Sequence, residues 1–116
     1  ERLAPVVYVP RMIMAAPVAV AIAVDGTGSA MSGFDAGRAA QNMMLAAWAE
    51  GVASCPNGIA DPDAARAVLG LAPTQVLVAI LALGYPARPR DPARRSPDEW
   101  SARAHRRRLG SVVTEL

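Results

Sequence analysis

Residues 17–24 read PVAVAIAV, and this stretch decides the fold because it is continuously apolar and rich in β-branched side chains. Such a run is typical of a strand that is covered on both faces. A second run of this kind, QVLVAILAL, occupies residues 75–83 and ends at Gly84, Tyr85 and Pro86. The two runs therefore predict buried strands of a sheet that lies between layers of helices.

The segment between the two predicted strands favours helix. Residues 34–50 are rich in Ala, Met and Leu and contain no proline, and Gly51 supplies a stop signal. The second half of this segment is apolar on every side, which predicts a buried helix. Residues 25–33 are predicted to form a turn-rich connection, and residues 54–59 a loop.

Two local patterns predict further helix starts. Asp61 followed by Pro62 has the form of an N-cap with proline at the first helical position, and Gly70 ends that short helix. Ser96 and Glu99 have the spacing of a capping box at the start of a final helix. Strand, helix, short helix and strand in this order indicate an α+β (α/β-like) domain.

The predicted elements do not close a sheet sandwich by themselves. Two strands and one long helix leave a layer to be supplied by upstream sequence or by a partner chain. The chain begins at Glu1 and enters an apolar stretch directly, so we expect it to be part of a longer domain whose N-terminal helices lie upstream.

Composition narrows the class of protein. With 116 residues and 53% hydrophobic content, the chain predicts one small folded domain. Cys55 is the single cysteine, so no internal disulfide and no Cys/His metal cluster is expected, which favours a reducing compartment such as the cytoplasm. The most apolar run, residues 12–24, contains Pro17 and is too short to cross a membrane.

The charges are distributed unevenly. All twelve basic residues are arginines, and the eight within residues 88–108 face only three acids, which gives that segment a net charge of +5. An anionic partner should therefore bind at this segment. Trp100 is its one aromatic residue and no known binding motif is present, so a nucleic acid is not the expected partner.

Four short motifs follow one another along the chain: AAPVAVAIAVD at residues 15–25, FDAGRAAQNMMLAAWAEGVASC at 34–55, DPDAARAVLGL at 61–71 and LALGYP at 81–86. In this order they resemble the second half of nitroreductase-family proteins. The resemblance covers residues 15–96 of a partial domain spanning 1–116, and residues 97–116 form a basic C-terminal helix and tail. It implies a nitroreductase-type sheet sandwiched by helices.

The resemblance also implies a cofactor site. Asn57, Gly58 and Ile59 would lie against the isoalloxazine ring of FMN, with a backbone N–H near its N5 atom, because glycine permits close backbone approach. Arg94 and Arg95 would bind the FMN phosphate, which guanidinium groups pair with in bidentate fashion. No side chain is expected to act as a nucleophile, and no metal is expected.

The implied activity is an FMN-dependent oxidoreductase that uses NADH or NADPH to reduce nitroaromatic, quinone or similar acceptors, as a homodimer. The family's Arg-Ser/Thr-x-Arg and Pro-Ser/Thr-x-x-Asn motifs have no counterpart in the sequence. We therefore expect the chain alone to bind FMN weakly or not at all. Two alternatives are a small subunit that completes the flavin site of a nitroreductase-like partner, and a cofactor-free interaction module.

Overall fold

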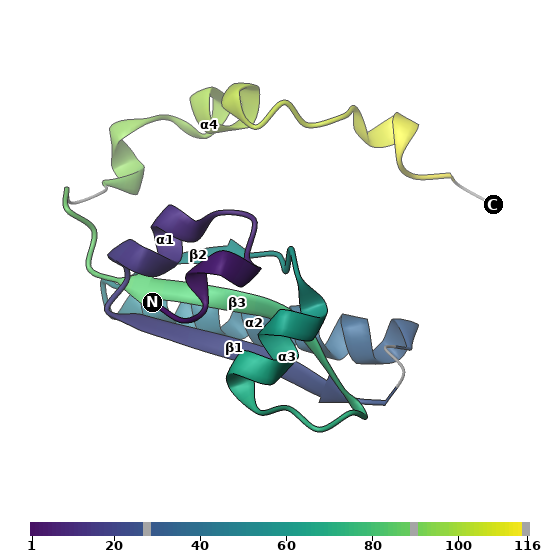
Figure 1. Ribbon diagram of the computed structural model, residues 1–116. Coiled ribbons are helices and arrows are strands. Elements are labelled where there is room, and N and C mark those ends of the chain that lie inside the picture. Colours follow the sequence, from purple (N-terminus) through teal and green to yellow (C-terminus); the bar gives the residue numbers. More distant parts are fainter. Residues whose placement is uncertain (27–28, 89–90, 115–116) are drawn as a thin grey trace. The chain divides into compact units, whose positions relative to one another are not determined.

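The chain divides into two units. The computed structural model describes residues 1–26, 29–88 and 91–114, and the units are Glu1–Pro86 and Ala87–Leu116. The first unit holds the sheet and the helices that cover it (Figure 1). Of the connection predicted over residues 25–33, residues 27 and 28 lie outside the described residues.

A three-stranded antiparallel sheet is the centre of the first unit. Its order is β1-β3-β2, so β3 (Gln75–Gly84) pairs with both β1 (Val18–Asp25) and β2 (Ala53–Asn57). The strands predicted at residues 17–24 and 75–83 are thereby confirmed. The central strand β3 is the more buried of the two, with Ile80, Leu81 and Ala82 enclosed, whereas β1 lies at an edge of the sheet and Val18 is 52% exposed, so the expectation that both strands are covered on both faces is wrong for β1.

The β1–β3 pair contains a bulge. Ile22 pairs with Ala79 and Ala23 pairs with Leu77, so Val78 has no partner in the ladder. An extra residue in one strand reverses the alternation of its side chains beyond that point. Leu77 and Ile80 consequently pack into the same hydrophobic cluster although they are three residues apart.

Helices cover both faces of the sheet. The long helix α2 (Ala30–Ala49) lies on one face, and η1 (Ala4–Val6), α1 (Pro10–Ala15) and α3 (Pro62–Leu69) lie on the other (Figure 1). The buried residues form two hydrophobic clusters, one on each face of the sheet. One contains Val6, Val7, Ile13, Ala65, Ile80 and Ala82, and the other contains Ile22, Ala36 and Leu81.

Two of the predicted elements differ from the structure. Helix α2 begins at Ala30 rather than at residue 34, because the Ser29 hydroxyl accepts a hydrogen bond from the Ser32 N–H at 3.2 Å and caps the helix. The loop predicted at residues 54–59 is wrong over its first part, which is β2. Proline is tolerated in β2 because this strand lies at the edge of the sheet.

The surface of α2 also differs from the expectation of a buried helix. Ala36, Ala40 and Met44 face the sheet, but the opposite side carries large apolar side chains that are 49% to 66% exposed. These side chains are Met31, Phe34, Leu45 and Trp48. Their spacing places them along one side of the helix.

The second unit contains short helical segments only. η2 (Pro92–Arg94) is followed by α4 (Pro97–Arg103) and η3 (Leu109–Ser111). The capping box predicted at Ser96 and Glu99 is confirmed, since each side chain bonds the other residue's backbone N–H, at 3.3 and 2.8 Å. Within the described ranges, no helix has both the length and the apolar character that a bilayer span requires.

Candidate functional site

The backbone that leaves β2 is held by the N-terminal segment. Val7 and Ile59 form an antiparallel β-bridge, and Val6 and Val7 are buried beneath it. Backbone hydrogen bonds join the two segments: Tyr8 N–H to the Gly58 carbonyl at 3.2 Å, Ala60 N–H to the Val6 carbonyl at 2.9 Å, and Asp61 N–H to the same carbonyl at 3.3 Å. The turn after β2 is therefore fixed on one side by residues that lie some fifty positions earlier.

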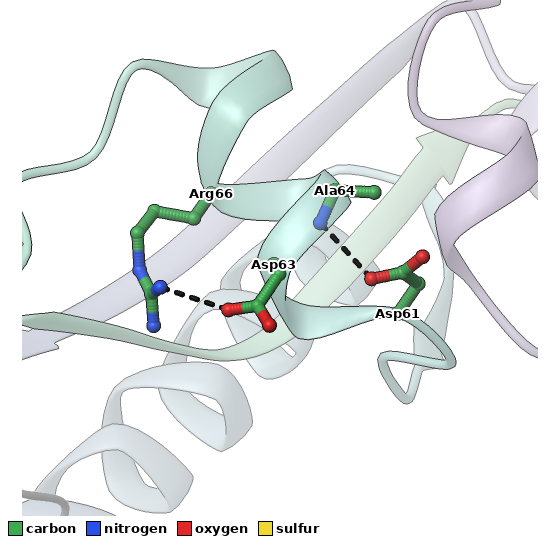
Figure 2. Close-up of polar contacts among 4 residues, drawn as sticks. All are labelled: Asp61, Asp63, Ala64 and Arg66. Carbon is green, nitrogen blue, oxygen red and sulfur yellow. Dashed lines mark hydrogen bonds and ion pairs between the residues drawn. The ribbon is translucent and has the colours of Figure 1, made fainter.

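The other end of this turn is fixed by the start of α3. The Asp61 carboxylate accepts a hydrogen bond from the Ala64 N–H at 3.0 Å, and Asp63 forms an ion pair with Arg66 at 2.9 Å (Figure 2). The cap satisfies a backbone donor that the helix leaves free, and Pro62 occupies a position where no N–H is needed. The N-cap predicted at Asp61 is confirmed.

The three residues predicted to contact a flavin lie side by side in different environments. The Asn57 side chain is 1% exposed, and neither its Nδ2 nor its Oδ1 atom has a hydrogen-bond partner. Ile59 is half-buried and packs against the cluster around Val6 and Ile80. Gly58 is exposed, so its backbone is the part of this group that a ligand reaches first.

Gly58 presents a backbone donor to its surroundings. In a regular antiparallel ladder, the hydrogen bond from Tyr8 to Gly58 would be matched by one from the Gly58 N–H to the Tyr8 carbonyl. In the described part of the chain this second bond is not formed, and the Gly58 N–H donates to no backbone carbonyl. A residue without a side chain and with a free N–H suits close approach by a flat, hydrogen-bond-accepting ring. The backbone at Gly58 thus fits the N5 edge of a flavin.

Arg94 and Arg95 lie in the second unit. Arg94 ends η2 and is exposed, whereas the Arg95 guanidinium carbon lies 4.7 Å from the centroid of the Trp100 ring. A cation over an aromatic face is attracted by the ring quadrupole. The Ser96 backbone N–H holds the pKa of the Glu99 carboxyl below its ordinary value, with a smaller effect from Arg95. The phosphate-binding role of the two arginines stays a prediction.

A shallow hollow lies elsewhere on the first unit. It is lined by α1, β2 and the end of β3, includes Met12, Cys55 and Tyr85, and has a volume of about 150 Å³. Pockets for drug-sized ligands and cofactors measure roughly 300–1,000 Å³. The hollow is therefore too small to enclose a flavin, and Cys55 at its wall is a free thiol.

Solved structures share the fold of this chain. A nitroreductase family protein from Clostridium difficile 630 is 24% identical, with 88% of this chain and 60% of that chain covered and a TM-score of 0.67. One from Clostridium novyi NT is 18% identical, with 78% and 57% covered and a TM-score of 0.68. The sheet with helices on both faces therefore defines an α+β domain of nitroreductase type.

A third structure is a single-residue variant of the FMN and NADPH-dependent nitroreductase NfnB from Sphigopyxis sp. strain HMH. It is 28% identical, with 91% of this chain and 46% of that chain covered and a TM-score of 0.67. The sequence model described as "Nitroreductase family" matches residues 3–85. The chain therefore belongs to the nitroreductase family, which is a family of oxidoreductases. It spans about half the length of these solved structures. No curated protein sequence matches it.

Sequence reasoning did not single out Tyr8. This residue shares a backbone hydrogen bond with Gly58, and its ring is 72% exposed beside it. The two positions are far apart in the sequence, and residues 1–16 carry no strand or cap pattern that would predict their pairing. The one local signal is the short run of β-branched and aromatic side chains at residues 6–9, between Pro5 and Pro10, which favours an extended segment.

Proposed function

We propose that this protein is an FMN-dependent oxidoreductase of nitroreductase type. The observation that carries the proposal is the exposed Gly58 backbone, with its free N–H, at the end of β2 in a nitroreductase-family fold. When bound, FMN would supply hydride transfer from NADH or NADPH to an acceptor such as a nitroaromatic compound or a quinone. The protein's contribution is then to bind, orient and shield the cofactor.

The residues of the turn have different roles in binding the cofactor. Gly58 donates its N–H to the N5 edge, and because it has no Cβ the Tyr8 ring can lie against it. Ile59 supplies apolar contact at the border of the core cluster. Asn57 lies beneath the turn, where the residue is almost fully enclosed.

Arg94 and Arg95 are proposed as the phosphate-binding residues. They are adjacent in sequence, and the segment around them carries an excess of positive charge. The Arg95 side chain packs on Trp100, which restricts its orientation while leaving the edge of the guanidinium group for hydrogen bonds. Hydrogen bonds between guanidinium and phosphate are charge-assisted, and they are correspondingly strong.

A flavin titration followed by NMR tests the proposal and detects weak binding. FMN is added to the ¹⁵N-labelled chain up to millimolar concentration, and riboflavin, which has no phosphate, is added in a parallel series. We expect the Gly58 amide resonance to shift with both ligands. Shifts confined to the arginine-rich segment, or no shifts at all, would contradict a flavin site at Gly58.

The arginines are tested in the same titrations. The double substitution Arg94→Ala and Arg95→Ala should weaken FMN binding by about tenfold or more, the effect of losing charge-assisted hydrogen bonds, and should leave riboflavin binding unchanged. The matched control is Arg103→Ala with Arg106→Ala, which removes the same charge from the same unit. If both double variants lost FMN affinity equally, the loss would be due to the change in net charge and not to Arg94 and Arg95 in particular.

We also propose that the protein forms a homodimer through α2. Exposed apolar side chains form an interrupted stripe on one side of this helix: Met31 and Phe34 lie near its start and Leu45 and Trp48 near its end, with the exposed Arg38 and Gln41 between the two pairs. Large exposed apolar patches on soluble proteins mark interaction surfaces. A second copy of the chain is the proposed partner because members of this family pair in this way, by the resemblance that the sequence carries. We propose a cytoplasmic location, because the sequence has a single cysteine, which is the usage expected of a reducing compartment.

Sedimentation equilibrium tests the dimer. Leu45→Glu puts a charge beside Trp48 at the end of the stripe and should convert a dimer to a monomer. Met14→Glu is the control, since Met14 is equally exposed but lies on α1, across the sheet from α2. A monomeric wild type that binds a nitroreductase-like chain through α2 would instead favour the small-subunit alternative.

A further inference from the structure

Tyr8 combines a fixed backbone with a free ring. Its N–H donates to the Gly58 carbonyl at 3.2 Å, and the preceding Val7 is 4% exposed and bridges to Ile59. The Tyr8 ring itself is 72% exposed. An exposed aromatic ring on a fixed backbone is able to make offset-stacked or edge-to-face contact with a planar ligand.

The ring lies directly against Gly58. A Cβ atom built on Gly58 would lie 3.1 Å from the Tyr8 Cδ2 atom and 3.4 Å from its Cε2 atom. The aromatic ring therefore takes up the side of Gly58 that a side chain would occupy. The free Gly58 N–H and the exposed Tyr8 ring therefore belong to the same pair of opposite residues, so one ligand can contact both.

We propose that Tyr8 is a positioning residue for the isoalloxazine ring that binds at Gly58. The inference rests on the proposed function. Opposite residues of an antiparallel pair lie about 5.5 Å apart, so a planar ring that accepts a hydrogen bond from the Gly58 N–H is within van der Waals reach of the Tyr8 ring. Aromatic rings favour offset-stacked or edge-to-face contact at this range. Tyr8 then limits how the flavin tilts about the Gly58 hydrogen bond.

Flavin fluorescence gives a readout that does not depend on enzyme activity. A tyrosine ring in contact with a flavin quenches its emission by electron transfer to the excited ring, whereas phenylalanine is too hard to oxidise to do so. We compare the emission of FMN with excess wild-type chain, Tyr8→Phe and Tyr8→Ala. Tyr85→Phe and Tyr85→Ala are the matched controls, because Tyr85 is also exposed in the first unit but lines the separate hollow.

The expected results differ between the two substitutions. Tyr8→Phe should keep FMN affinity within about twofold and raise the emission of the bound flavin, while Tyr8→Ala should weaken binding by about three- to tenfold, as the loss of one aromatic contact does. The Tyr85 variants should match the wild type in both respects.

The outcomes separate this inference from the proposed function. Flavin shifts at the Gly58 amide with no change in emission or affinity for either Tyr8 variant would overturn the role of Tyr8 alone. Absence of those shifts in the wild-type chain up to millimolar FMN would overturn the proposed flavin site, and the role of Tyr8 with it. A fall in affinity that is equal for Tyr8→Ala and Tyr85→Ala would also overturn the inference.

Discussion

The Pro17 Cδ atom lies 2.9 Å from the position that a Cβ atom on Gly84 would occupy. Pro17 immediately precedes β1, and Gly84 is the last residue of β3, so the two residues meet where these neighbouring strands begin and end. The glycine is needed for this close approach, because a proline ring is part of the backbone and cannot rotate away.

Gly84→Ala should therefore destabilise the fold by about 1–3 kcal/mol, the usual cost of overpacking. Urea unfolding followed by circular dichroism measures the free energy of unfolding. Gly37→Ala is the control, because no atom lies within 4 Å of its added Cβ and it lies inside α2, so it should stabilise the chain by about 0.5–1 kcal/mol. Equal effects at the two positions would contradict the contact.

Asn57 is expected to lower the stability of the isolated chain, since its buried amide has no hydrogen-bond partner. Asn57→Val keeps a similar volume, suits a strand, and should raise the free energy of unfolding by about 1–3 kcal/mol. The exposed Asn42 on α2 serves as control, and its change to Val should have an effect within about 0.5 kcal/mol. A loss of stability for Asn57→Val would mean that the amide is paired in solution.

Substitutions at Leu81 and Leu45 test which of the two side chains is buried in solution. Leu81 lies on β3 and is fully buried in the cluster that contains Ala36 of α2, so Leu81→Ala should cost about 2–5 kcal/mol of stability. Leu45 is exposed in the chain alone, and Leu45→Ala should change the stability by about 0.5 kcal/mol or less at low protein concentration. A cost at Leu45 that grows with concentration would report association through α2.

The Glu99 carboxylate gives a pH dependence to α4. Its pKa is lowered from 4.5 by the Ser96 backbone N–H, so the folded helix binds this proton less readily than the unfolded chain does. The resulting stabilisation is present above pH 4.5 and is lost as the pH falls through the lowered pKa. NMR titration of the Glu99 carboxyl measures this pKa. Ser96→Ala removes the hydroxyl acceptor from the capping box and should let the helix fray, which raises the pKa toward 4.5. An unchanged pKa would contradict the pairing.

Local patterns were sufficient to predict the parts of this fold that depend on neighbouring residues. The strands at residues 17–24 and 75–83 and the caps at Asp61 and Ser96 are written in consecutive side chains. β2 was missed because it is short, contains Pro56 and has a polar end, and it becomes a strand only through pairing with β3. Strand formation there is a tertiary effect.

The candidate site was predictable to a smaller extent. Family motifs pointed to residues 57–59, but the sequence does not distinguish the enclosed Asn57 side chain from the exposed Gly58 backbone. Tyr8 was beyond reach, because its contact with Gly58 depends on a bridge between residues that are widely separated in the chain. The second half of α2 was predicted to be apolar, while the exposure of Leu45 and Trp48 follows from how the helix packs on the sheet.

The strand order has a consequence for biosynthesis. β1 and β2 each pair with β3, which is the last of the three to emerge from the ribosome. Before Gln75 has been synthesised, the nascent chain contains β1, α2 and β2. It lacks β3, the strand with which both β1 and β2 pair. The sheet therefore cannot form until β3 has been made, and until then the apolar side chains of β1 and α2 lack the strand against which they pack.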